Sequence, residues 1–151
     1  MVNNYNNSRN YKKSKDNEIN DVIKKIGECT KLKEIPMKEL VNKDDGYAYI
    51  IAKYSKDKKM KTNQLRKFFG AVRKIEGKNS WEDMEVQFYL LKPRMAASTG
   101  RNKIPKLFFK VISVAMDKVD VGTDDEKLEN FKIFVEFFEA IVAYHKFLGG
   151  L

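Results

Sequence analysis

The chain has 151 residues, a size that fits one domain, and its 42% hydrophobic and 12% aromatic content excludes a wholly disordered protein. One cysteine and one histidine exclude an internal disulfide framework and a histidine-rich metal site, and they favour a cytoplasmic location. The formal net charge of +9 creates a positive field that attracts polyanions such as nucleic acid, acidic proteins or anionic membranes.

The first sixteen residues differ in composition from the rest of the chain. They are rich in asparagine and poor in aliphatic residues, and four cations make them basic: Arg9, Lys12, Lys13 and Lys15. Such a segment cannot bury enough apolar surface to offset the entropy that is lost on ordering. Residues 1–16 are therefore predicted to form a flexible tail, and residues 17–151 a single helical domain.

Three helices are predicted before residue 60. The first has an apolar face with the i, i+3, i+4, i+7 spacing of an amphipathic helix, formed by Ile19, Val22, Ile23 and Ile26. Pro36 suits the start of a short helix that runs to Val41. The apolar spacing returns after the helix-start signals Asp44 and Asp45, at Tyr47, Ile50, Ile51 and Tyr54.

Two helices with capping signals follow. Thr62 is the predicted N-cap of the first and Gly77 its end, with an apolar stripe of Leu65, Phe68, Phe69, Val72 and Ile75. Ser80 is the predicted N-cap of the second, whose inward residues are Trp81, Met84, Phe88 and Leu91. Because Pro93 lacks an N–H and clashes with the preceding turn, residues 94–101 either continue this helix past a kink or form a separate turn.

The last two helices are predicted from Ile104 to near Gly122, and from a cap at Thr123 or Asp124 to about Leu148. The final helix is apolar on two faces, which indicates burial on several sides. It is either the central helix of the bundle or part of a subunit interface, which would use the aromatic residues Phe134, Phe137, Phe138, Tyr144 and Phe147. Charged residues interrupt it, so a membrane span is not expected.

These patterns predict an all-α fold, a compact bundle of about six helices. Little catalytic chemistry is visible. His145 lies beside an apolar stripe, as a core histidine would, and the carboxylate pairs at residues 44–45 and 124–125 lie at helix starts, where they complement the helix dipole. Because motifs for nucleotide or metal binding are lacking as well, we expect no enzyme activity, no metal and no cofactor.

Positive charge gathers in two clusters. The first is the polar face of the helix after Thr62, formed by Asn63, Arg66, Lys67, Arg73 and Lys74 around Gly70. That glycine would allow either close approach of a phosphate backbone or close helix packing. The second cluster surrounds the small and hydroxyl residues 96–100 and consists of Lys92, Arg94, Arg101 and Lys103. Such groups suit the phosphates and riboses of RNA, and binding by cations predicts affinity that depends on salt but not on sequence.

Three segments resemble one known family. The runs KTNQLRKFFGAVRKI (61–75), LLKPRMAASTGR (90–101) and FVEFFEAIVAYHKF (134–147) are similar to the small subunit of type III-A CRISPR effector complexes, the Csm small-subunit family. The likeness runs from about residue 18 to the end of the sequence.

The resemblance implies a helical, non-catalytic protein of antiviral defence. It implies that several copies stack with other Csm subunits along the guide–target RNA duplex, and that Arg66, Lys67, Arg73, Lys92, Arg94 and Arg101 face single-stranded RNA. The residues alone leave two other functions open. One is a stand-alone helical DNA-binding protein, and the other is a scaffold whose charge serves acidic protein partners.

Overall fold

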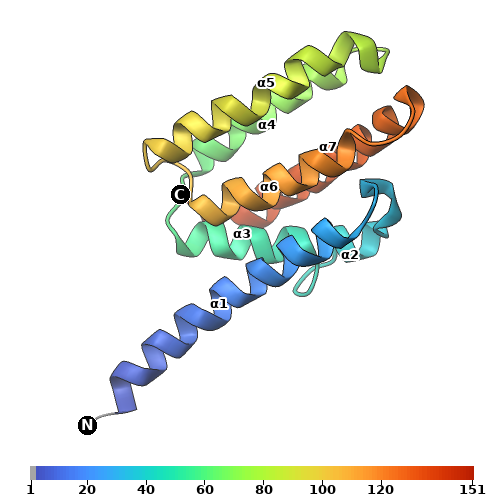
Figure 1. The fold of residues 1–151 in the computed structure, drawn as a ribbon. Coiled ribbons are helices and arrows are strands. Elements are labelled where there is room, and N and C mark those ends of the chain that lie inside the picture. The colour runs from blue at the N-terminus through green and yellow to red at the C-terminus, as the bar shows by residue number, and fades with distance from the viewer. Residues whose placement is uncertain (1–2) are drawn as a thin grey trace.

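The computed structural model describes residues 3–151, with side chains from residue 16 onward. Within that range the chain forms α-helices, one 3₁₀ helix and no strand, so the predicted all-α class is confirmed (Figure 1). The expected flexible tail over residues 1–16 falls almost wholly outside the described side chains, so it stays a prediction. The elements are α1 (Asn3–Glu28), η1 (Leu32–Glu34), α2 (Met37–Val41), α3 (Tyr47–Asp57), α4 (Thr62–Glu76), α5 (Trp81–Gly100), α6 (Lys106–Val119) and α7 (Asp124–Phe147).

The helices lie in three tiers (Figure 1). The paired helices α4 and α5 form one outer tier, α6 and α7 the middle tier, and α1 and α3 the other outer tier. Helix α7 contacts α2, α3, α4, α5, α6 and η1, while α1 packs on α6 and α3. Of the two roles that the sequence left open for the last helix, the structure therefore shows the central one.

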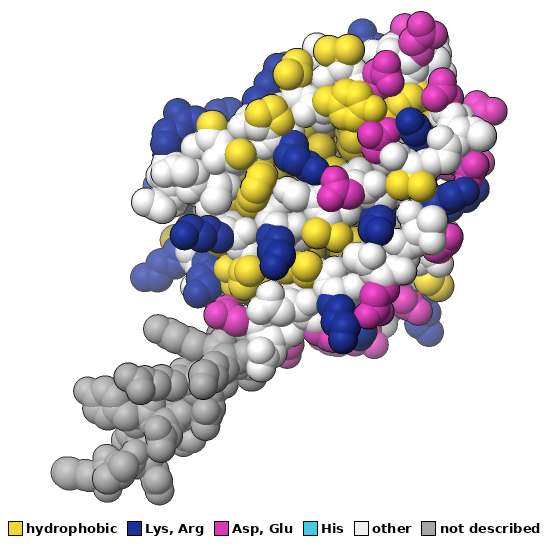
Figure 2. Space-filling model, in the orientation of Figure 1, with side chains coloured by type: hydrophobic (Ala, Val, Ile, Leu, Met, Phe, Trp, Pro, Cys, Tyr) yellow, Lys and Arg dark blue, Asp and Glu magenta, His cyan; other side chains and the backbone are white. Residues whose placement is uncertain are grey.

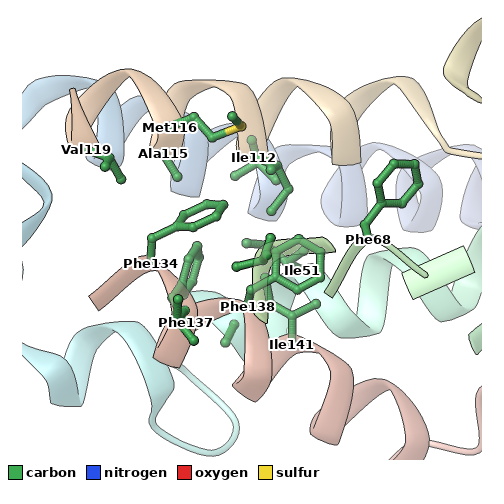
Figure 3. Packing of buried hydrophobic residues seen from close by; sticks show 14 of the residues in the cluster. Ile51, Phe68, Ile112, Ala115, Met116, Val119, Phe134, Phe137, Phe138 and Ile141 are labelled. Carbon is green, nitrogen blue, oxygen red and sulfur yellow. The ribbon is translucent and has the colours of Figure 1, made fainter. Parts of the chain in front are cut away.

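Aromatic side chains of α7 fill the middle of the core (Figure 3). Phe134, Phe137 and Phe138 are fully buried and lie among residues of α3, α4 and α6. In this fold they cannot contact a partner, because the chain's own helices cover them. The surface expected at a subunit interface therefore narrows to Tyr144, which is half-buried, and Phe147, which is 65% exposed.

The helix boundaries follow the capping signals with one correction. The Ser80 hydroxyl accepts from the Asp83 N–H at the start of α5, as predicted. Helix α5 then continues through Pro93 to Gly100, so the segment after the proline is not a separate turn. Thr62 is not an N-cap: Lys61 holds that position, and the Thr62 hydroxyl lies 3.2 Å from Nδ1 of His145. The threonine serves a tertiary contact instead of the helix end.

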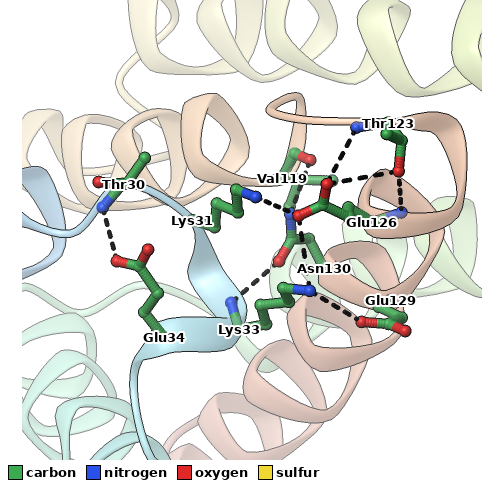
Figure 4. Close-up of polar contacts among 9 residues, drawn as sticks. All are labelled: Thr30, Lys31, Lys33, Glu34, Val119, Thr123, Glu126, Glu129 and Asn130. Atoms are coloured by element: carbon green, nitrogen blue, oxygen red, sulfur yellow. Dashed lines mark hydrogen bonds and ion pairs between the residues drawn. The ribbon is translucent and has the colours of Figure 1, made fainter.

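A polar junction joins η1 to the start of α7 (Figure 4). Thr123 and Glu126 form a capping box, in which each side chain accepts from the other residue's backbone N–H. The Glu126 carboxylate also pairs with the ammonium groups of Lys31 and Lys33. The hydrogen bond from Lys31, helped by the Thr123 N–H, lowers the pKa of Glu126 to about 2. The carboxylate is therefore ionised under all mild conditions.

Asn130 closes the inner side of this junction. Its side chain is fully buried, its Oδ1 accepts from the Lys33 N–H at 2.9 Å, and its Nδ2 donates to the Val119 carbonyl at 3.3 Å (Figure 4). One amide thus links backbone groups of η1 and of the last turn of α6, where the Val119 carbonyl also accepts from the Val121 N–H at 2.9 Å.

Replacement of Asn130 by alanine removes the hydrogen bond that the Lys33 N–H donates and one of the two that the Val119 carbonyl accepts, and it leaves a hole at a fully buried position. We expect Asn130→Ala to lower the free energy of unfolding by about 1–3 kcal/mol, measured by urea denaturation. The exposed Asn79 is the matched control, and its alanine variant should stay within about 0.5 kcal/mol of the wild type. Equal stability of the two variants would contradict a structural role for the Asn130 amide.

Candidate nucleic-acid interface

A groove of about 570 Å³ runs between α4 and α5. Cations stand along its rim, and buried apolar side chains form its floor. The rim cations are Arg66, Lys67 and Lys74 of α4, Lys78 of the following loop and Arg94 of α5. Ala71, Ile75, Met84 and Leu91 form the floor, and Asp83 and Gln87 complete the lining. We call this concavity, with these residues, the α4–α5 groove.

The charge of the α4–α5 groove is unbalanced. Five cations face a single carboxylate, that of Asp83. Within the described part of the chain, none of the five forms an ion pair, although eight such pairs occur elsewhere. A cleft lined by one sign of charge, over a low-dielectric floor, concentrates its field and attracts ions of the opposite sign. The groove therefore has a positive potential that favours anions.

Gly70 keeps the middle of the groove open. A Cβ atom placed on this glycine would meet nothing within 4 Å, so close helix packing does not explain the residue. Glycine in a helix interior costs about 1 kcal/mol relative to alanine. Of the two roles that the sequence allowed, unobstructed access between flanking cations is the one that fits the geometry.

The core fixes the two walls of the groove. Helix α4 buries Leu65, Phe68, Val72 and Ile75, and Phe69 stacks on Phe138 of α7 with ring centroids 5.9 Å apart. Helix α5 is held through Phe88, which packs edge-to-face against Phe131 of α7 at 6.0 Å. Since both walls rest on the same central helix, the core sets the spacing of the four rim cations that lie on α4 and α5, and only Lys78 lies on a loop.

The groove brings together some of the predicted RNA-binding residues and leaves others out. Arg66, Lys67 and Arg94 line it. Arg73 lies outside, where its guanidinium pairs with Glu76 at 3.4 Å and covers the Phe69 ring at 5.7 Å. Lys92 also lies outside, because its ammonium is 2.6 Å from the Asp117 carboxylate. An RNA contact by Arg73 or Lys92 would have to replace these pairs.

The second predicted cluster is divided by the structure. Arg101 and Lys103 follow the end of α5, away from the groove lining. Ser98, which precedes both residues, is buried, and the Thr99 hydroxyl donates to the Met95 carbonyl within α5. Sequence reasoning missed Lys78. Its spacing of four residues from Lys74 continues the cationic face past the helix end and was the signal for it.

A family model described as Csm2 Type III-A matches residues 34–150, which include every helix from α2 to α7. The chain belongs to the Csm2 family. It is therefore a small subunit of the type III-A CRISPR (Csm) complex, with other Csm subunits as its partners, and the resemblance seen in the sequence is confirmed. No curated protein and no solved structure matches the chain.

The remaining chemistry of this Csm2-family chain is sparse. Among residues 16–151, no cluster of three or more His, Cys, Asp or Glu side chains has the arrangement of a metal site. No helix in the described part of the chain is long and apolar enough to cross a membrane.

The only histidine secures the start of α4. His145 is fully buried, as expected for a core histidine, and its Nε2 donates to the Met60 carbonyl at 2.9 Å. The Thr62 hydroxyl is then the donor to Nδ1. Gly150 lies so close over the imidazole that a Cβ there would clash with the ring, and the Leu151 carbonyl accepts from the Thr62 N–H at 3.0 Å. The last residues of the chain thus hold the beginning of one groove wall.

Burial lowers the pKa of His145, and the hydrogen bond to Met60 only partly opposes this effect. In the unfolded chain His145 is protonated near pH 6.5, whereas in the folded chain it is protonated only at a lower pH. We expect the stability to fall as the pH drops below about 6.5, and the contribution of His145 to that fall to end below its folded pKa.

Urea denaturation of wild type and His145→Gln across this pH range measures the effect. Glutamine supplies a donor and an acceptor but does not titrate, so its midpoint should change less with pH. Parallel pH profiles of the two proteins would show that His145 does not carry this dependence.

Proposed function

We propose that this Csm subunit is non-catalytic and holds the backbone of single-stranded RNA, guide or target, in the α4–α5 groove. The observation that carries the proposal is the row of five cations around an open concavity, none of which forms an ion pair with residues 16–151. Membership of the Csm2 family supports it, since an RNA-guided complex needs subunits that bind backbone rather than sequence. In this proposal the chain acts in the cytoplasm as part of antiviral defence.

The lining accounts for binding without sequence readout. Rim cations reach phosphate oxygens, while the apolar floor of Met84 and Leu91 is suited to ribose and base faces. Gln87 and Asp83 are the only uncharged or acidic polar groups in the lining, too few to read successive base edges. Base pairing between guide and target would supply the sequence specificity, and the protein would bind the RNA backbone.

The outer face of α5 supports contacts with other subunits. Val86, Tyr89 and Leu90 are 61%, 47% and 40% exposed and follow the i, i+3, i+4 spacing of one helix face. Hydrophobic side chains are visible over the α5 tier in Figure 2. Because α5 also buries an inner apolar face, it is apolar on two sides, as a helix covered by a partner would be. We assign stacking with copies of itself or with other Csm subunits to this face.

Charge reversal at Arg66 and Arg94 tests the groove. We expect the double variant Arg66→Glu, Arg94→Glu to bind single-stranded RNA roughly tenfold more weakly in fluorescence anisotropy. Across a salt series, the slope of log affinity against log salt should fall by about 0.7 for each lost phosphate contact.

Arg73→Glu with Lys92→Glu is the matched control, because it removes the same positive charge outside the groove. Its RNA affinity should change much less than that of the groove variant. Equal losses in both double variants would mean that RNA responds to net charge alone, and the groove assignment would be wrong.

Carboxylates on the outer face of α5 test the subunit contact. We expect Val86→Glu with Leu90→Glu to leave the fold and the RNA affinity intact but to reduce co-purification with the Csm complex. Met37→Glu, at an apolar residue that is 42% exposed on α2, is the control and should assemble normally. Normal assembly of the α5 variant would exclude this face as the contact.

A further inference from the structure

A second concavity with an excess of positive charge lies at one end of the helical tiers. It measures about 210 Å³ and lies between the α3–α4 and α5–α6 connections. Four lysines line it, Lys58 and Lys59 from the first connection, Lys103 from the second and Lys106 at the start of α6. Met60 and Ile104, both buried, are part of the same lining. We call this concavity, with these residues, the lysine pocket.

No carboxylate lines the lysine pocket, and none of its four lysines forms an ion pair in the described part of the chain. Figure 2 shows Lys and Arg side chains gathered at this end of the visible face, whereas Asp and Glu side chains gather mainly at the opposite end. Four exposed ammonium groups around one concavity give it a positive potential, which favours an anion between them. The pocket therefore lacks an internal counter-charge.

Backbone hydrogen bonds order the two connections that carry Lys58, Lys59 and Lys103. Lys59 and Asn102 adopt positive φ angles of 61° and 59°, and the two connections share one hydrogen-bond pattern. In each, three successive N–H groups return to the preceding helix: those of residues 58, 59 and 60 in the first, and of 101, 102 and 103 in the second. A lysine at positive φ is disfavoured relative to glycine, so the fold keeps a cation where glycine would relieve the backbone.

We propose that the lysine pocket is a phosphate-binding site, separate from the α4–α5 groove and independent of the function proposed for it. Its volume is about seven times the roughly 30 Å³ that a water molecule occupies in the liquid, enough for a phosphate group and a few waters. Ammonium groups are point donors that bind phosphate without a fixed geometry. The start of α6 adds favourable potential, because Pro105 precedes it without a side-chain cap.

Lys59→Gly separates ligand binding from structure. It removes one ammonium group and also the strained side chain, so the variant should melt at a higher temperature than wild type yet bind phosphate more weakly. Lys132→Gln, on the exposed side of α7 outside the pocket, removes the same charge and should leave phosphate binding unchanged.

Titration of the full chain with inorganic phosphate, followed by amide chemical shifts, is the first arm of the test. We expect saturable shifts at the two connections in wild type and an affinity lower by roughly two- to fivefold in Lys59→Gly. A groove variant, Arg66→Glu with Arg94→Glu, should keep these shifts, so failure of the groove assignment would not be mistaken for failure of the pocket.

The second arm uses single-stranded RNA on the groove variant. Loss of its residual RNA affinity on adding Lys59→Gly identifies a strand phosphate as the ligand, whereas unchanged RNA affinity with intact phosphate shifts identifies a free phosphate. Absence of saturable shifts, or equal shifts in wild type and Lys59→Gly, would overturn the proposal. A change in self-association without phosphate binding would overturn it as well and would assign the lysines to a protein contact.

Discussion

Packing of aromatic rings along α7 is the interaction on which the rest of the molecule depends. Phe131, Phe134 and Phe138 follow one another along the helix, with neighbouring ring centroids 6.3 and 6.1 Å apart. Rings from the outer tier and from α6 close on this row, Phe88 from α5, Phe69 from α4 and Phe108 from α6. Because each large ring buries much apolar surface, a central helix of this composition can hold short neighbours that would be marginal alone.

The anchoring of the outer tier leaves its opposite side free for function. The inner faces of α4 and α5 pack against α7, and the groove lies between the two helices on the side that α7 does not cover. The same core contacts that stabilise the fold therefore fix the distance between Arg66 and Arg94. The His145–Thr62 contact secures the beginning of the wall that carries Arg66 and Lys67, so the C-terminal residues contribute to the geometry of the site without touching it.

Helices and core were readable from the sequence because apolar spacing reports a buried face. Ile19, Val22, Ile23 and Ile26 are all buried, as are Trp81, Met84, Phe88 and Leu91. The role of α7 was not readable, since a helix that is apolar on two faces fits both a core and an interface. Spacing also could not separate Arg66 from Arg73, because both lie on the polar face of α4 and only the position of α5 decides which one lines the groove. The lysine pocket could not be predicted from the sequence, because its residues come from two connections about forty positions apart that only the fold brings together.

The uneven distribution of charge between the two ends of the visible face affects the rate at which the subunit associates with charged partners. On the face that Figure 2 shows, Lys and Arg side chains gather at the end that holds the lysine-rich connections, and Asp and Glu side chains gather mainly at the other end, so the field along this face is uneven. In the field of a polyanion an uneven charge distribution of this kind turns the cationic end forward before contact. If the proposed RNA contact forms, its encounters would be oriented rather than random, with the acidic end turned away from the strand. This asymmetry would change the association rate constant more than the equilibrium affinity. The effect on the rate would disappear at an ionic strength high enough to make the Debye length shorter than the domain.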